Sequence, residues 1–482
     1  MSDLSRRAFL SGAAALTAVP AFGQVPRSGE VDVVIVGAGA AGIAAARRLA
    51  AGGRRFALIE ASDRVGGRCI TDTRTFGVPF DRGAHWIHIP ETNPVLRLAR
   101  DGFEIDQGAR GLQLRIGRRN AREGEVEDFL VAQVRSRRAI LEASRGAGDV
   151  ACARALPNDL RDWRETVEFV LGSYGCGKDL AEVSAKDFAR IDEREIDAIC
   201  RQGYGALLAK LAEGIAVTRA APVKRIDWSR GIGVETDKGR LSARALIVTV
   251  STNVLAGGTI AFQPELPKSV LDACAKLSLG SYDQIALELP GNPLGLQRDE
   301  LIFEKAAGRD TAALLGNVSG TSLCIVHVGG GFGRDLAARG EAAMTAFALD
   351  WLTKLYGTDM RKAVKRTAAT DWNKAPYVRG AFSAAAPGGQ PARRLLMQPL
   401  GNRIWFAGEA AHETLWGTVG GAWESGERAA AAVLKQLDAP AQRLRPERRT
   451  PRASTRDNRP QRRQSAPPGG RGPDSVPYPL QN

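Results

Sequence analysis

The stretch VDVVIVGAGAAGIAAARRLA, residues 31–50, decides the fold of this chain. Residues 31–36 are almost all apolar and mostly β-branched, which is typical of a parallel strand buried on both faces. This run leads into three glycines spaced as GxGxxG and then into a helical stretch over residues 43–51. A second apolar run, residues 56–59, ends at Glu60. The order of strand, glycine turn, helix and strand predicts the opening βαβ unit of a Rossmann-type α/β fold.

Each glycine of the turn has a physical task. Gly37 allows the tight turn, Gly39 lets the backbone approach a pyrophosphate, and Gly42 lets the helix pack closely on the strand. The N-terminus of the helix then faces the phosphates. Glu60, 18 residues beyond Gly42, is placed to accept hydrogen bonds from a ribose diol. These features together predict a dinucleotide site.

A second glycine motif indicates which dinucleotide is bound. RVGGR, residues 64–68, follows Glu60 closely and resembles the second glycine signature of the flavin-containing amine oxidase family, which implies FAD. Further motifs of that family follow in the same order, and they resemble those of polyamine oxidases most: DRGAHWIH (81–88), GYG (203–205) through Val223 and Ile226, LGSYDQIALE (279–288), FAGE (406–409) and GTVGGA (417–422). The resemblance therefore covers the chain from residue 31 to about residue 437.

The resemblance implies an α/β protein with a discontinuous Rossmann-type FAD-binding domain and an α+β substrate-binding domain that has a mixed sheet and a helical insertion. We expect the FAD-binding domain to comprise residues 31–100, 203–260 and 395–438. The substrate-binding domain would then comprise residues 101–202 and 261–394.

Three segments carry expectations about local structure. LIVTV, residues 246–250, reads as another buried strand, and a helix is expected to open at residues 417–422 and to run to about Leu437. Within residues 157–200 the apolar side chains have helical spacing. We expect them in the core rather than at the cofactor, for example Leu160, Trp163, Val167, Val170 and Leu171.

The family motifs also imply which residues hold the cofactor. These residues fall in the two glycine turns, at the end of the second strand, in the middle segment and in the C-terminal flavin segment: Gly37, Gly39, Ala40, Ala41, Gly42, Glu60, Ala61, Arg64, Gly67, Arg68, Val223, Gly408, Glu409, Thr418 and Val419. Ala381 stands where monoamine oxidases carry the cysteine that binds flavin covalently. We therefore expect non-covalent FAD.

Amine oxidation needs an uncharged amine, whereas a free alkylamine is protonated at neutral pH. A dry pocket favours the neutral form because desolvation penalises the ammonium. The resemblance implies that Phe382 lies beside the flavin ring and that Trp372 buttresses the flavin domain. Trp416 either forms a second wall or packs in the core. Thr418 takes the place of the second cage tyrosine of monoamine oxidases.

Two further positions bear on the chemistry. His88 aligns with the residue that hydrogen-bonds the substrate amine in polyamine oxidases, although a histidine packed into the structure is the alternative; a substrate role for His85 is the weaker hypothesis. Gln284 occupies a place where most members have a lysine linked through water to flavin N5. Glutamine keeps hydrogen-bonding capacity but brings no cation, so reoxidation by O2 and reoxidation by another electron acceptor both stay open.

The two ends of the chain differ from the body. Within residues 1–30, Arg6 and Arg7 precede an apolar stretch that is too short to span a bilayer and resembles a twin-arginine signal. This predicts export to the periplasm, with a cytoplasmic location as the alternative, and no integral membrane segment after signal removal. Residues 439–482 contain ten arginines and nine prolines, a composition that predicts a disordered basic tail.

Composition narrows the choice of function. The net charge is +14, but the tail carries half of it, since its ten arginines face three acidic residues; we therefore predict no nucleic-acid partner. The six cysteines form no CxxC pair, so no metal site is predicted. The expected partners are a small-molecule amine and O2 or another acceptor. The alternatives are an amine dehydrogenase, an L-amino-acid oxidase or tryptophan-2-monooxygenase-like enzyme, and an inert flavoprotein.

Overall fold

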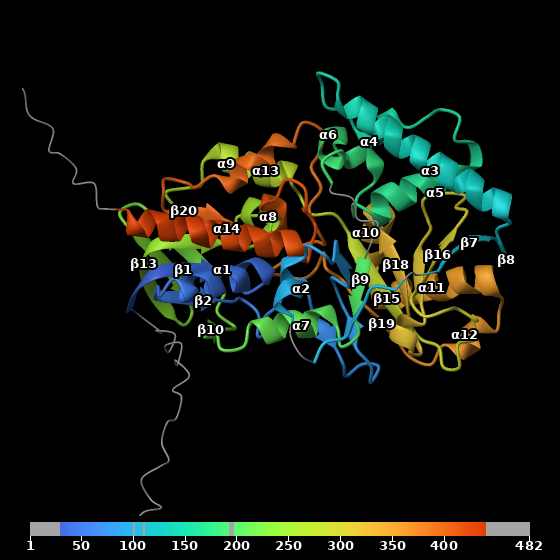
Figure 1. Ribbon diagram of the computed structural model, residues 1–482, viewed down its shortest axis with the longest axis horizontal. Coiled ribbons are helices and arrows are strands. Elements are labelled where there is room, and N and C mark those ends of the chain that lie inside the picture. Colours follow the sequence, from blue (N-terminus) through green and yellow to red (C-terminus); the bar gives the residue numbers. More distant parts are fainter. Residues whose placement is uncertain (1–28, 100–101, 109–110, 192–196, 440–482) are drawn as a thin grey trace, which may run out of the picture. The chain divides into compact units, whose positions relative to one another are not determined.

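A computed structural model describes residues 29–99, 102–108, 111–191 and 197–439 (Figure 1). The signal-like residues 1–28 and nearly all of the basic tail lie outside the described residues. The described residues up to Asp438 belong to one compact unit.

The first of two large sheets has eight strands and begins with the 31–36 run. Its central strand β1 (Gly29–Val36) lies parallel to β2 (Phe56–Ile59) on one side and to β13 (Gly239–Val248) on the other. The remaining strands continue the sheet outward: β10 (Val217–Thr218), β20 (Ile404–Phe406), β12 (Ile232–Thr236), β11 (Val223–Asp227) and β14 (Ala261–Gln263).

Both faces of this sheet are covered, which explains why residues 31–36 are apolar except for Asp32. Val33 and Ile35 point into one core cluster, whereas Val34 and Val36 point into another. Helices α1 (Ala40–Ala51) and α14 (Val419–Asp438) lie side by side over the first face (Figure 1). The other face packs against three helices: α8 (Thr252–Ala256), α9 (Lys268–Lys276) and α13 (Pro391–Met397).

The second large sheet has seven strands and is mixed, because β16 (Glu300–Glu304) runs parallel to β7 (Leu112–Ile116) and the other pairs are antiparallel. The other strands of this sheet are β15 (Tyr282–Glu288), β17 (Ala313–Gly316), β18 (Leu323–Gly329), β19 (Thr367–Ala369) and β8 (Arg119–Asn120). One face packs against α10 (Gly330–Ala338), α11 (Glu341–Tyr356) and α12 (Met360–Ala363). The other face contributes to the cavity described below.

Smaller elements connect the two sheets. Two short sheets pair β3 (Thr71–Asp72) with β4 (Phe80–Asp81), and β9 (Asp197–Cys200) with β5 (Trp86–His88) and β6 (Ile105–Asp106). The helices near them are α2 (Pro94–Leu98) and α7 (Tyr204–Leu211).

A helical insertion packs beside the second sheet. It contains α3 (Glu123–Ser144), α4 (Cys152–Ala155), η1 (Arg161–Trp163), α5 (Arg164–Glu168), η2 (Phe169–Tyr174), η3 (Leu180–Glu182) and α6 (Ala185–Phe188).

The sheets refine the predicted division of the chain. The first sheet takes strands from 31–100, 203–260 and 395–438, as the family motifs indicate, but also β14 from the 261–394 range. Helix α9 from that range packs on the same sheet. The predicted boundary at residue 260 is therefore wrong, because the chain stays on the first sheet through Leu277 before it enters β15.

The helical prediction for residues 157–200 is correct only in part. Helical turns run from Arg161 to Tyr174, but residues 197–200 form strand β9. Leu160, Trp163, Val167 and Leu171 lie in the core as expected, whereas Val170 lines the cavity. Val170 lies in a π-helical turn, Phe169–Tyr174, and packs against the same core cluster with its other side.

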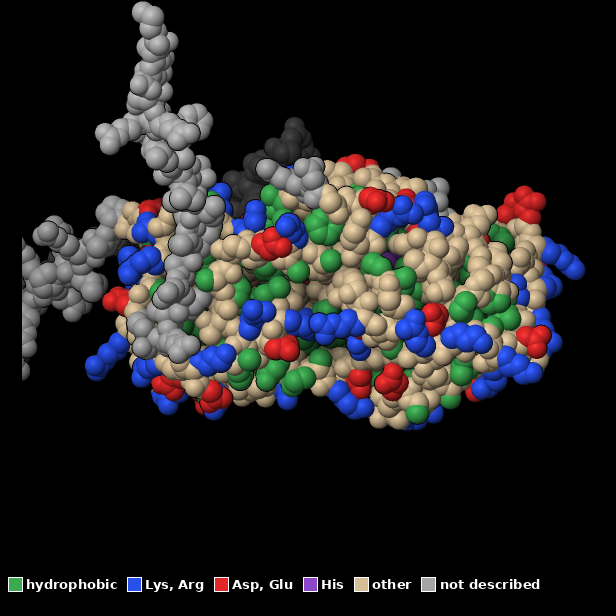
Figure 2. All heavy atoms as spheres, turned by 90° about the horizontal axis from the view of Figure 1, so that it is seen from below, with side chains coloured by type: hydrophobic (Ala, Val, Ile, Leu, Met, Phe, Trp, Pro, Cys, Tyr) green, Lys and Arg blue, Asp and Glu red, His purple; other side chains and the backbone are tan. Residues whose placement is uncertain are grey.

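Charged side chains of both signs lie on the face of the molecule shown in Figure 2. On the face that Figure 2 shows, Lys and Arg side chains are interspersed with Asp and Glu. In the part of the chain that the structure describes, no helix combines the length and the hydrophobicity that a bilayer crossing would need.

Candidate active site

A cavity of about 1270 Å³ runs from the glycine turns of the first sheet to the face of the second sheet. Its volume exceeds the roughly 300–1,000 Å³ of ordinary small-molecule pockets. It therefore has room for a large cofactor together with a substrate. We call the part beside the two glycine turns the cofactor end, and the part beside β15 and β18 the aromatic end.

The first glycine turn has the backbone that the sequence predicts. Gly37 has φ of +103°, and a Cβ on it would lie 2.4 Å from Thr249 Oγ1. A Cβ on Gly42 would lie 1.8 Å from the Gly37 carbonyl oxygen, so the helix can sit this close to the turn only with glycine there. Helix α1 begins at Ala40 and directs its N-terminus to the cavity. This geometry fits a bound pyrophosphate.

The second glycine turn lies directly against the first. Gly66 donates its N–H to the Ala38 carbonyl oxygen at 2.8 Å, and Gly66 and Gly39 form a parallel β-bridge. Gly66 has φ of +102° and Gly67 has φ of +59°, conformations that favour glycine. The two motifs therefore build one continuous backbone surface at the cofactor end.

Glu60 is fixed by its neighbours in the position that a ribose would need. One carboxylate oxygen accepts a hydrogen bond from Ala38 N at 2.6 Å, and the other accepts from Ser62 N and Oγ. Glu60 is buried and lines the cavity. Its carboxylate thus helps to hold the glycine turn and keeps lone pairs available to a diol.

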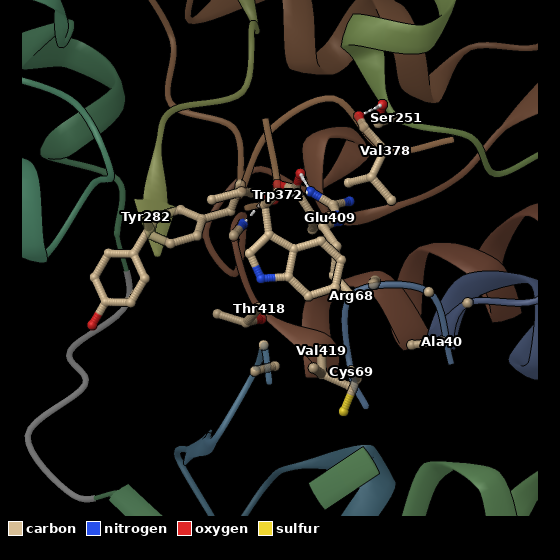
Figure 3. Close-up of a pocket in the computed structure, with 18 of the residues that line it drawn as sticks. Ala40, Arg68, Cys69, Ser251, Tyr282, Trp372, Val378, Glu409, Thr418 and Val419 are labelled. Atoms are coloured by element: carbon tan, nitrogen blue, oxygen red, sulfur yellow. Dashed lines mark hydrogen bonds and ion pairs between the residues drawn. The ribbon is translucent and has the colours of Figure 1, made fainter. Parts of the chain in front are cut away.

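An ion pair between Arg68 and Glu409 forms part of the cavity wall. Arg68 donates to a Glu409 carboxylate oxygen at 2.9 Å, and Figure 3 shows the two side chains together with Trp372. Burial opposes ionisation of Glu409, but Arg68 and Ser383 outweigh it, so the pKa of Glu409 is lowered. Glu409 also accepts from Gly417 N at 2.9 Å. A charged Glu409 therefore ties the 64–68 turn to the start of the last helix.

Most of the predicted cofactor residues meet at this cavity. The wall includes Gly37, Gly39, Ala40, Ala41, Glu60, Ala61, Arg64, Gly67, Arg68, Val223, Gly408, Glu409, Thr418 and Val419. Gly42 does not line it and instead packs against Gly37, which is the packing task that its position predicts. The donor set and the two backbone turns fit an FAD.

The aromatic end is built by rings from several elements. Phe382 lies 5.8 Å from Tyr282, measured between ring centroids, and Tyr282 lies 5.9 Å from Tyr174. Phe303 makes an edge contact with Tyr174 at 5.2 Å. Burial raises the pKa of both tyrosines above the ordinary value, so they stay neutral. These rings give the dry wall that the chemistry requires.

Two of three further predicted residues, Trp372 and Thr418, line the cavity, and the third, Trp416, lies in the core. Trp372 lines the cavity and donates from its indole N–H to the Arg82 carbonyl oxygen at 2.9 Å. Thr418 lines the cavity and accepts from Gly421 N at 2.9 Å, so it caps α14. Trp416 is not among the described residues that line the cavity. It is fully buried in the core beneath the Arg393 guanidinium, so the predicted second wall is wrong and the core alternative is correct.

His88 lies on β5 and pairs with a residue that sequence analysis missed. Its Nδ1 lies 2.6 Å from the Asp197 carboxylate, and both side chains line the cavity. Asp197 stands opposite His88 on β9. The sequence did not indicate it, because the helical spacing expected for residues 157–200 gives no sign of strand β9. The pair puts a carboxylate at the aromatic end, which attracts a cationic nitrogen.

Gln284 lines the cavity from β15 as predicted. Its Nε2 donates to the Gly83 carbonyl oxygen at 3.1 Å. Its Oε1 is buried and has no hydrogen-bond partner among the described residues. The amide oxygen is therefore available to a group from outside the chain.

His327 is a second cavity residue that sequence analysis missed. It lies on β18 directly across from Gln284, and neither ring nitrogen has a partner within the described part of the chain. Burial lowers its pKa to about 3, helped by nearby His85, so it is neutral. The signal was present in the sequence, because a lone histidine interrupts the apolar run LCIVHVG, residues 323–329.

A buried ionic network supports the wall behind Phe382. Arg393 makes two hydrogen bonds to Asp187, at 2.6 and 2.7 Å, and both side chains are 0% exposed. Arg393 also donates to Ser383 Oγ at 3.2 Å, and Ser383 donates to Glu409. The network links the helical insertion to the wall at Glu409.

Asp283 gives a prediction for the pH dependence of stability. Burial raises its pKa to about 6. This exceeds the value of about 3.9 in an unfolded chain, so ionisation destabilises the folded state as pH rises from about 4 through 6. Asp283→Asn should therefore raise the Tm at about pH 8, with the advantage disappearing near pH 4. Thermal melts across that range check this. Exposed Asp272→Asn is the control, and a difference that does not vary with pH would contradict the account.

Comparisons with known proteins identify the family of this chain. The family model described as flavin containing amine oxidoreductase matches residues 40–142 and 151–434. The chain is 27% identical to the human peroxisomal N(1)-acetyl-spermine/spermidine oxidase, over 88% of this chain and 98% of that protein. It is 26% identical to the human lysine-specific histone demethylase 2, over 83% of this chain but only 53% of that protein.

The fold also matches that of a solved structure. Cyclohexylamine oxidase from Brevibacterium oxydans superposes with a TM-score of 0.72 at 23% identity, covering 85% of this chain and all of that one. The family match spans most of the chain and includes the two walls of the cavity. The chain therefore belongs to the flavin-containing amine oxidoreductases.

Proposed function

We propose that this protein oxidises a primary or secondary amine, polyamine-like or other. Non-covalently bound FAD would accept a hydride from the α-carbon of the amine at N5, which gives an imine that hydrolyses to an aldehyde. O2 would be reduced to H2O2. The observation that carries the proposal is one cavity that joins two glycine turns to an aromatic end holding a carboxylate.

The aromatic end selects the reacting form of the amine. Phe382, Tyr282 and Tyr174 exclude water there, which favours an uncharged nitrogen. Asp197 and His88 attract the protonated amine from solvent and orient it. The N-terminus of α14 faces the cavity at Thr418 and Val419, and the positive end of its dipole favours negative charge on a reduced cofactor.

The charges at the aromatic end argue against an amino-acid oxidase. Among the described residues that line the cavity, the basic side chains Arg64 and Arg68 both belong to the second glycine turn. Arg68 also donates to the carbonyl oxygen of Ala381, next to Phe382, but it is already paired with Glu409, whereas the carboxylate of an amino acid would need a cation of its own. The arrangement supports an amine without a carboxylate.

Anaerobic mixing of the purified protein with a series of amines tests the proposed reaction. We expect bleaching of the flavin absorbance with at least one alkylamine and no bleaching with the corresponding α-amino acid. Bound FAD that no amine bleaches would support an inert flavoprotein instead.

Gln284 makes the electron acceptor a separate question. Because glutamine brings no cation to the position usually held by lysine, an amine dehydrogenase is the second candidate. Mixing the amine-reduced enzyme with O2 in a stopped-flow instrument decides between them. Reoxidation fast enough to sustain turnover supports the oxidase, and slow reoxidation that an added acceptor accelerates supports the dehydrogenase.

Non-covalent binding and export complete the proposal. Ala381 offers no thiol to the cofactor, so denaturation should release FAD into the supernatant.

The Arg6-Arg7 segment supports export through a twin-arginine route to the periplasm. Fractionation of cells expressing the full chain tests this, and replacing both arginines with lysine should retain the protein in the cytoplasm.

A further inference from the structure

Three buried side chains with unused hydrogen-bonding atoms meet at the aromatic end, and we call them the imidazole–amide cluster: His85, Gln284 and His327. They are 6%, 2% and 1% exposed, and all three line the cavity. The unpartnered atoms are His85 Nε2, Gln284 Oε1 and both ring nitrogens of His327. A buried polar atom without a partner destabilises the folded protein. The cluster is therefore suited to receive a polar group from outside the chain.

The members of the cluster are close together. Gln284 and His327 are direct partners across the antiparallel pair β15 and β18, and side chains at such positions stand on the same face of the sheet. His85 acts electrostatically on His327. None of the three groups is a fixed cation, although most family members place a lysine at the Gln284 position.

Asp81 determines which ring nitrogen of His85 carries the hydrogen. His85 Nδ1 lies 3.2 Å from a carboxylate oxygen of Asp81. Asp81 also accepts from Thr71 Oγ1 at 2.5 Å and from the backbone N–H of Tyr204 at 3.0 Å. Because Asp81 acts as an acceptor throughout, Nδ1 of His85 carries the hydrogen and Nε2 of the neutral ring has a free lone pair.

We propose that His85 accepts the proton that the substrate ammonium loses on binding, while Gln284 Oε1 and His327 hydrogen-bond the resulting amine. This inference rests on the proposed function and assigns the reacting nitrogen its site. The N–H bond of the ammonium breaks and an Nε2–H bond forms on His85. The positive charge moves to an imidazolium that faces Asp81, so the total charge is unchanged.

Burial distinguishes His85 from His88 in this role. The side chains of His88 and Asp197 are 21% and 25% exposed, so water screens that pair. His85 and Asp81 are 6% and 2% exposed, and an ion pair in that position is screened much less. Asp81 is in direct contact with His85, and His327 interacts with it electrostatically. His88 thus guides the cation, and His85 neutralises it.

Proton release on binding tests the inference without turnover. The probe is a tert-alkylamine, which has no hydrogen on its α-carbon, titrated into the FAD-loaded protein in two buffers of different ionisation enthalpy. The wild type should release almost no protons to the buffer because His85 captures them. His85→Gln should release about one proton per bound amine, since only the neutral amine fits the dry end. His88→Gln is the matched control: it should bind the amine more weakly, because His88 orients the cation, but it should release almost no protons per bound amine.

Two results would overturn the inference: equal proton release in His85→Gln and the wild type, or release only in His88→Gln. The flavin spectrum and the Tm of each variant show whether it folds and loads FAD. If His85→Gln does not fold, Asp81→Asn gives a second test, because weaker support of the imidazolium should produce partial proton release. If oxidisable amines fail to bleach the wild-type flavin, the proposed function itself fails, which is a different outcome.

Discussion

Gly42→Ala should yield a protein that binds FAD about 5- to 100-fold more weakly than the wild type. The added Cβ would lie 1.8 Å from the Gly37 carbonyl oxygen and 3.0 Å from its carbon. Helix α1 must then move away from the turn that receives the pyrophosphate. Overpacking of one methyl group costs about 1–3 kcal/mol, and each 1.4 kcal/mol is about tenfold in affinity. Titration of the apoprotein with FAD, followed by flavin fluorescence, measures the effect.

Gly231→Ala is the matched control, because a Cβ there meets nothing within 4 Å and the residue joins two strands of the same sheet. We expect this variant to bind FAD as tightly as the wild type. Equal affinity of Gly42→Ala and the wild type would show that the GxGxxG turn is not the cofactor site.

Arg393→Met should lower the free energy of unfolding by about 3–5 kcal/mol, the usual cost of leaving one member of a buried ion pair alone. The reason is that Asp187 would keep its charge at 0% exposure without its bidentate partner. Denaturant unfolding of the FAD-loaded protein measures the loss. Arg135→Met breaks the exposed pair with Asp159 and should cost less than about 1 kcal/mol.

A double variant separates lost charge pairing from lost packing. Asp187→Leu together with Arg393→Met removes both charges, and we expect it to recover much of the stability that Arg393→Met loses. A double variant as unstable as the single one would mean that Arg393 acts mainly through Ser383 and the Ala410 carbonyl oxygen.

The parts of the fold that local sequence determines were predictable. The GxGxxG turn specifies its own geometry, because Gly37 and Gly42 sit where a Cβ would collide with Thr249 or with the backbone, whereas a Cβ on Gly39 would only touch Gly67 at 3.8 Å. The strand predicted over residues 246–250 followed from its apolar run, although β13 ends at Val248, and the last helix followed from the glycines before it.

The aromatic end depends on pairing between distant strands, which local patterns do not encode. His327 meets Gln284 only through the register of β15 and β18, and Asp197 meets His88 only through β5 and β9. Trp416 directly precedes the GTVGGA motif in sequence, yet it packs beneath Arg393 in the core. Tyr282 could have been found, since it lies two residues before Gln284 and the side chains of a strand alternate between its faces.

The most direct measurement compares flavin bleaching by one alkylamine with and without deuterium at the α-carbon, under anaerobic stopped-flow conditions. If the cavity holds an FAD that receives a hydride from an uncharged amine, the purified protein is yellow, the amine bleaches it, and deuteration slows the bleaching. A protein that takes up no FAD, or whose bound FAD keeps its colour with every amine offered, would contradict this account.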